Sequence, residues 1–273
     1  MFADLPAEIL QQIIERHLTD NSQSLKSCSL VCWQWRHVTL PVLMSKVVMA
    51  HGQTSNPVGH QVFTAKDIHE SVPFLSRYLR HLVVSTSAYL LRSEDANRAS
   101  FDAVFYALIT SIPHFTRLSR ISLTGDAMFK LLSSTQVDLS NISHFTVYRP
   151  GRILQIKTIR AFTHLRVLHL IGISLDPNEA AIAWSRDPSD TNPIPVLEEL
   201  ALQLAPIPFD IFVNWVCRTE TLDFSQLKTL KISTGDGEAE RKCFLNHLAP
   251  LVGTNLQTLD LDFYSKSVQL ERQ

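Results

Sequence analysis

From residue 79 onward, a six-residue pattern recurs seven times in this chain of 273 residues. Each copy has apolar residues at its first, fourth and sixth positions. The copies are Leu79–Val84, Leu118–Leu123, Ile142–Val147, Leu165–Leu170, Leu197–Leu202, Leu227–Ile232 and Leu256–Leu261, and their first residues lie 23 to 39 residues apart. Because side chains alternate between the two faces of a β-strand, the fourth and sixth positions predict short strands that bury one face.

Between these hexamers, four segments have apolar residues at helical spacing. They are Arg98–Ile112, Ile153–Phe162, Asp210–Arg218 and Glu238–Val252. Strand, turn and helix repeated at this interval are typical of an α/β array whose neighbouring units stack to bury a shared core. We therefore expect an α/β fold, with the proline-rich segment Asp176–Pro195 as a loop insertion that carries one short helix.

The hexamers resemble those of a divergent leucine-rich-repeat array. This resemblance implies an irregular solenoid over residues 76–273, with about seven strands forming a parallel sheet on its concave face. Regular repeats have Asn or Cys three residues after the last apolar position of the hexamer. This chain has Ser87, Asp126, Pro150, Ile173, Ala205, Gly235 and Tyr264 there. Because few of these side chains can hydrogen-bond the turn, we expect an irregular array.

The first forty-odd residues predict two short helices. Pro6 suits the first position of a helix, and Glu8 complements the positive end of the helix dipole. The apolar residues of the first helix span about 180° of its circumference, wider than the roughly 100° that one-sided burial needs. They are Ile9, Leu10, Ile13, Ile14 and Leu18.

The second helix is predicted to bury one stripe of residues, with Leu30 and Trp33 pointing elsewhere. The stripe consists of Leu25, Cys28, Val31, Cys32 and Trp35. Segment Leu40–Met49 is expected to be a third helix or an extended exit, broken by Pro41. A unit of about 45 residues buries too little surface to be stable alone, and surplus exposed apolar surface indicates a protein interface.

The order of residues in this segment is Leu5-Pro6-x-Glu8-Ile9-Leu10, followed by Ile13, Leu18, Leu25 and Val31-Cys32-x-x-Trp35-Arg36. This order resembles an F-box, and the whole chain resembles a fungal-type F-box protein. The resemblance implies a small all-helical F-box of three short helices at residues 1–48. A linker and the first helix of the array would follow at residues 49–75.

The F-box resemblance also implies partners. The chain would bind a Skp-family adaptor, and through it the cullin and RING subunits of a ubiquitin ligase, as the substrate receptor. Trp33 departs from the family pattern, which often has a basic residue there. The positions expected at or just behind the adaptor surface are Leu5, Pro6, Ile9, Leu10, Ile13, Leu30, Val31 and Trp35.

A target protein is expected on the open face of the strands, formed by the third and fifth hexamer positions and the residue after the hexamer. The candidate residues are His81, Arg120, His144, Tyr148, His169, Glu199, Lys231 and Asp260. Tyr and Arg are enriched in binding hot spots. The alternative is that these are ordinary solvated strand positions, because every repeat array has such a face. The three histidines lie on different repeats, so we expect neither a metal site nor a catalytic site among them.

Composition excludes several classes of function. A formal net charge of −1 without a basic run argues against nucleic-acid binding. No apolar run approaches the roughly 18 residues of a membrane span. With 8 glycines and no glycine-rich phosphate-binding motif, a nucleotide enzyme is not expected. The four cysteines are expected to be small buried hydrophobic residues.

We therefore expect a non-enzymatic substrate receptor, in the cytoplasm or nucleus, without cofactor or metal. Two alternatives stay open. One is a scaffold protein that binds the adaptor but engages no cullin. The other is a hydrolase or transferase with an active site among the histidines of the open face.

Overall fold

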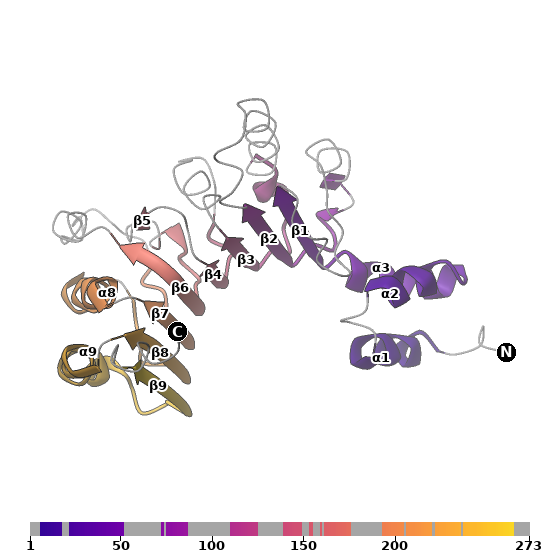
Figure 1. Cartoon of the computed structure of the whole chain (residues 1–273). Helices are drawn as coiled ribbons and strands as arrows, with labels where there is room; N and C mark the ends of the chain where they lie inside the picture. Colours follow the sequence, from indigo (N-terminus) through magenta and orange to yellow (C-terminus); the bar gives the residue numbers. More distant parts are fainter. Residues whose placement is uncertain are drawn as a thin grey trace, which may run out of the picture. The chain divides into compact units, whose positions relative to one another are not determined.

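The computed structural model describes residues 6–17, 22–51, 72–73, 75–86, 110–124, 139–148, 153–154, 159, 161–175, 193–204, 206–219, 222–235 and 237–264. The chain divides into two compact units, Met1–Leu118 and Ser119–Gln273. Figure 1 labels the helices and strands of both units. None of the helices in the described part of the chain is long and apolar enough to cross a membrane.

The first unit begins with three short helices, as predicted: α1 (Ala7–His17), α2 (Ser22–Ser29) and α3 (Trp33–Leu43). The predicted second helix is divided in two, because a turn interrupts it. In this turn the backbone N–H groups of Leu30 and Val31 donate to carbonyls three residues earlier, and Cys32 is extended. The third helix therefore begins at Trp33, earlier than predicted, and it continues past Pro41 to Leu43.

The three helices share a small core. Its buried members are Leu10, Ile14, Leu25 and Val38, and Trp35, Val42 and Leu43 pack against it while partly exposed. Two parallel strands follow in this unit, β1 (Lys46–His51) and β2 (His81–Thr86). Strand β1 was not predicted, although it begins at the third position of a further copy of the hexamer, Met44–Met49. It begins inside the range expected for the F-box and extends into the range expected for the linker.

The second unit contains a sheet of parallel strands in the order β3 (Arg120–Thr124), β4 (His144–Tyr148), β6 (Val167–Leu175), β7 (Glu199–Leu204), β8 (Thr229–Gly235) and β9 (Thr258–Tyr264). Each of these strands, like β2, begins at the third position of a hexamer. Each of the seven hexamers thus lies on a strand of the described residues. The short strand β5 (Ile153–Leu154) pairs with the end of β6, so the helix predicted from Ile153 was wrong at its start.

A repeated hydrogen-bond pattern sets the register at the start of each strand. The carbonyl of Ser119, a second hexamer position, accepts from the N–H groups of Ser143 and His144 in the next copy. Glu198 accepts from the next copy in the same way. Before the strand, the N–H of Leu118 donates to the carbonyl of Phe115 at 2.9 Å, and Phe115 is buried. A buried apolar residue three positions before the hexamer therefore belongs to the pattern.

Helices cover one side of the sheet. Helix α8 (Pro206–Thr219) packs on β6, β7 and β8, and α9 (Gly237–Cys243) contacts α8 and β9. Figure 1 shows both helices on the same side of the strands. After α9 the chain continues as a π-helix (Phe244–Leu248) and a 3-10 helix (Ala249–Leu251). The helices predicted at 210–218 and 238–252 are therefore present.

Other predictions fall largely outside the described residues. Of the helix expected at 98–112, only residues 110–112 are described, at the start of a short 3-10 helix, η2 (Ile112–His114). The insertion expected at 176–195 is described only from residue 193. The expectation of buried cysteines was wrong for Cys32, which is exposed, and Cys28 and Cys243 are only partly buried.

Burial within the hexamers follows the predicted alternation. The fourth and sixth positions are buried in all six strands from β2 to β8 that carry a hexamer. The exception is β9, the last strand in the order, where Leu259 is 51 % exposed and Leu261 is also exposed. An outermost strand has a neighbouring strand on one side only, so its apolar residues are less covered.

Candidate interaction surfaces

The apolar arc of α1 divides into a buried and an exposed part. Leu10 and Ile14 are 0 % exposed in the core of the three helices, whereas Ile9 is 42 % exposed and Ile13 is also exposed. Successive helical residues are separated by about 100°, so Ile9 and Ile13 share one flank of the helix while Leu10 and Ile14 face inward. A helix with this distribution leaves apolar surface for another molecule.

The turn between α2 and α3 exposes a second apolar group. Leu30 is 85 % exposed and Trp33 is 77 % exposed, and Val31 is exposed beside them. The Trp33 ring stacks on the His37 ring, with the centroids 5.2 Å apart and the planes 9° apart. This contact restrains the indole although most of its surface is open. Exposed large apolar residues in a cluster are typical of interaction sites.

The structure separates the predicted adaptor residues into two groups. Pro6, Ile9, Ile13, Leu30 and Val31 are exposed, as an interface requires. Leu10 is completely buried and Trp35 is partly buried against the core, so these two lie behind the surface and are not exposed contacts. Leu5 lies outside the described residues.

Trp33 was not among the predicted contacts, although it is one of the most exposed apolar side chains of the helical module. The sequence contained a signal for it, since Trp33 does not fall on the apolar stripe expected to be buried. An exposed Trp is among the residues most often found at the energetic centre of interfaces.

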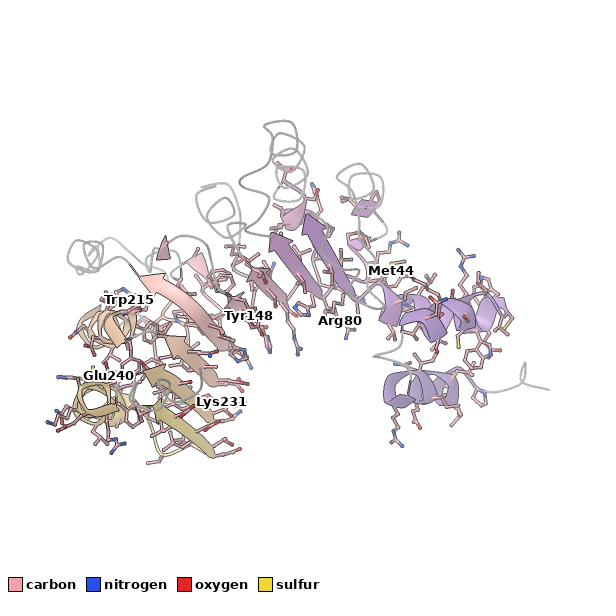
Figure 2. All side chains as sticks on the ribbon, viewed as in Figure 1. Met44, Arg80, Tyr148, Trp215, Lys231 and Glu240 are labelled. Carbon is pink, nitrogen blue, oxygen red and sulfur yellow. The ribbon has the colours of Figure 1, made fainter. Side chains whose placement is uncertain are left out.

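The second candidate surface is the side of the sheet opposite α8 and α9. We call it the open face and define it by three rows of residues that the parallel register places side by side. The first row is Arg120, His144, Val167, Glu199, Thr229 and Thr258; the second is Ser122, Thr146, His169, Ala201, Lys231 and Asp260; the third is Thr124, Tyr148, Ile171, Gln203, Ser233 and Asp262. In Figure 2, Tyr148 and Lys231 project from this side, and Trp215 and Glu240 lie on the helices.

Seven of the eight predicted target-binding residues lie on the open face. His81 lies on β2, in the other unit. Arg120, Tyr148, Lys231 and Asp260 are exposed, and the remaining three are partly buried. This agrees with the predicted alternation, while their role in binding stays a prediction.

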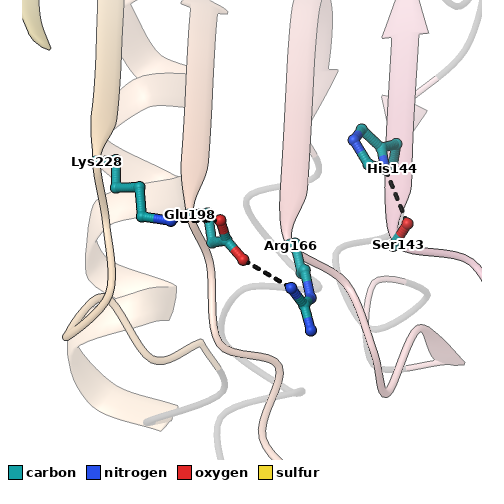
Figure 3. Close-up of polar contacts among 5 residues, drawn as sticks. All are labelled: Ser143, His144, Arg166, Glu198 and Lys228. Carbon is teal, nitrogen blue, oxygen red and sulfur yellow. Dashed lines mark hydrogen bonds and ion pairs between the residues drawn. The ribbon is translucent and has the colours of Figure 1, made fainter.

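Two polar contacts fix histidines on this face. The His169 Nε2 lies 3.0 Å from the Glu199 Oε1 on the neighbouring strand. The His144 Nδ1 lies 2.8 Å from the Ser143 Oγ (Figure 3). Partial burial lowers the pKa of His144, and the positive charge of Arg120 lowers it further. A neutral His144 beside a charged Arg120 is therefore favoured at neutral pH.

An ionic row borders the open face where the strands begin. Arg166 donates to Glu198 at 2.9 Å, and Lys228 donates to the other oxygen of Glu198 at 2.8 Å; Figure 3 shows the three side chains. The hydrogen bond from Lys228 is the main cause that lowers the pKa of Glu198. These residues occupy the second hexamer position in three successive copies. The alternating charge at this position is visible in the sequence, but the ionic row was not predicted.

The two histidines of the open face do not converge on one site. His144 and His169 lie on adjacent strands in different rows and contact different partners. Across the described part of the chain, no group of three or more His, Cys, Asp or Glu side chains is placed to hold a metal ion.

Comparison with known proteins adds one finding. Residues 2–49 match the family model of the F-box-like domain, which covers the three helices and the start of β1. No curated protein matches the chain. F-box domains bind Skp-family adaptors. The chain thus contains an F-box-like domain at residues 2–49.

Proposed function

We propose that this chain is the substrate-recognition subunit of a Skp-cullin-F-box ubiquitin ligase. The observation that carries the proposal is the F-box-like domain at residues 2–49, whose helices leave Ile9, Ile13, Leu30, Val31 and Trp33 exposed. Covering such side chains with an adaptor removes apolar surface from water, at roughly 25 cal/mol per Å². The cullin and RING subunits would be reached through the adaptor.

The second unit would bind the target. Its parallel strands with helices on one side support the interpretation as a divergent leucine-rich-repeat-like array, in which the open face is available to a partner. Holding a target there raises its effective concentration near the ubiquitin-transferring enzyme. The chain itself would perform no chemistry, and we place it in the cytoplasm or nucleus with the ligase.

The adaptor part of the proposal is tested by co-expressing the full chain with a Skp-family adaptor and measuring co-purification. Ile9→Asp puts a charge among the exposed apolar residues of α1 and should abolish co-purification. Gln11→Asp introduces the same residue into the same helix, on the flank opposite Ile9, and should have little effect. Equal loss in both variants, or full retention in Ile9→Asp, would contradict the proposed interface.

The ligase part needs a second measurement, because a scaffold protein could also bind the adaptor. Purified adaptor complex is mixed with cullin and RING subunits and analysed by size-exclusion chromatography. A receptor should elute with the cullin in a stoichiometric complex. Adaptor binding without cullin would favour the scaffold function.

A further inference from the structure

The charged residues of the open face are separated across the sheet. Arg120 lies on the first strand of this unit's sheet, β3, and Asp260 and Asp262 lie on the last, β9; all three are exposed. Within the described residues, none of the three makes a side-chain hydrogen bond or ion pair. Lys231 is adjacent to Asp260 and offsets one of the two aspartates, so this end of the face keeps a net negative charge.

The centre of the face is less polar. His169 and Glu199 pair with each other there, which leaves little net charge. Tyr148 is exposed and lies beside Ile171 on the adjacent strand, and Ala201 is partly exposed on the next strand. A basic end, an apolar centre and an acidic end therefore follow one another from β3 to β9.

The dimensions of the face suit one extended chain. Six neighbouring strands span five intervals of about 4.8 Å, or roughly 24 Å. An extended peptide advances about 3.3 Å per residue, so roughly seven residues bridge the two charged ends. A segment lying along a strand would contact only one charged end, because the charges are separated across the strands.

We propose that the open face binds an extended peptide segment of the target that carries an acidic and a basic side chain about seven residues apart, with an apolar side chain between them. The acidic side chain pairs with Arg120, the apolar one packs on Tyr148 and Ile171, and the basic one pairs with Asp260 and Asp262. This inference rests on the proposed function, since it assigns a class of ligand to the target-binding unit.

The test uses the full chain and fluorescently labelled, end-capped peptides of Ser and Thr. Each peptide has one Asp, one Lys and a Leu midway, with the Asp–Lys separation varied from about three to about eleven residues in both orders. Fluorescence anisotropy should show the tightest binding at separations of six to eight residues. Binding should weaken as salt is raised, because exposed ion pairs are screened.

A charge reversal makes the test specific. Arg120→Glu leaves acidic residues at both ends of the open face. The affinity for the Asp–Lys peptide should therefore fall about fivefold, and the affinity for a Lys–Lys peptide of the same spacing should rise. Lys242→Glu makes the same change in charge on the exposed surface of α9, on the other side of the sheet, and should alter neither affinity.

Three results would overturn the inference: no binding of any peptide, no preference for separation, or equal effects of the two variants. Adaptor co-purification distinguishes this failure from failure of the proposed function. If Arg120→Glu and the unchanged chain both retain the adaptor while no peptide binds, only the ligand class is wrong. If the adaptor is not bound but the spacing preference is observed, the F-box part of the proposed function fails.

Discussion

Replacing Leu30 by Ala should weaken adaptor binding without affecting the fold. Leu30 is 85 % exposed in the turn between α2 and α3, so the substitution removes almost no packing from the chain itself. It deletes three carbon atoms, worth about 2.4 kcal/mol if fully buried at roughly 0.8 kcal/mol per carbon. Most of this surface is open in the free chain and would be covered by an adaptor. The substitution should therefore cost about 2 kcal/mol of binding free energy, which is a roughly 30-fold increase in Kd.

The matched comparison is Leu10→Ala, which removes the same atoms from a side chain that is 0 % exposed in the core of the three helices. Substitutions of this kind typically cost about 2–5 kcal/mol of stability. Adaptor affinity is measured by isothermal titration calorimetry, and the stability of α1 and α3 by amide hydrogen exchange. We expect Leu30→Ala to change affinity alone, and Leu10→Ala to lose hydrogen-exchange protection in these helices.

Two outcomes would refute this reasoning. If Leu30→Ala binds the adaptor as tightly as the unchanged chain, the exposed turn is not part of the interface. If it loses hydrogen-exchange protection to the same extent as Leu10→Ala, the Leu30 side chain packs against the chain itself and contributes to the fold.

Two further predictions concern the second unit. Gly253→Ala should destabilise the second unit by about 1–3 kcal/mol, because a Cβ there would lie 2.8 Å from the carbonyl oxygen of Ser225, a backbone atom with little room to move. An unchanged thermal unfolding temperature would contradict this prediction. Partial burial and the charge of Arg120 lower the pKa of His144 in the folded chain. Below about pH 6.5 the unfolded chain therefore binds a proton more readily than the folded chain, and the free energy of unfolding should fall as the pH drops. Chemical denaturation across this range should show a shallower decline for His144→Gln than for the unchanged chain. An identical pH dependence in the two chains would contradict the assignment.

Local pattern predicted much of the second unit. The seven hexamers marked seven strands and their starting positions, because alternation with a period of two is a property of the strand itself. Helix α8 was equally visible from its apolar spacing. Strand β1 was missed although Met44, Val47 and Met49 repeat the apolar spacing of the hexamer, because methionine stands where the other copies begin with leucine or isoleucine. The turn at Leu30–Cys32 was also missed, because apolar residues on both sides of it continue the helical spacing.

For the candidate sites, sequence alone named exposed contacts such as Ile9, Ile13 and Leu30, but it also named Leu10, which is buried. It placed Arg120, His169 and Lys231 on the open face, but neither the His169–Glu199 pair nor the Arg166–Glu198–Lys228 row was predicted. These contacts join residues about 30 positions apart, and only strand pairing brings them within hydrogen-bonding distance.

The sequence by itself determined which residues belong to strands, which belong to an F-box-like domain, and which side of each strand is apolar. The tertiary structure decided which half of the apolar arc of α1 is covered and which charges of the open face meet. The physical reason is that period and propensity act along the chain, whereas burial and electrostatic pairing depend on neighbours brought together by folding.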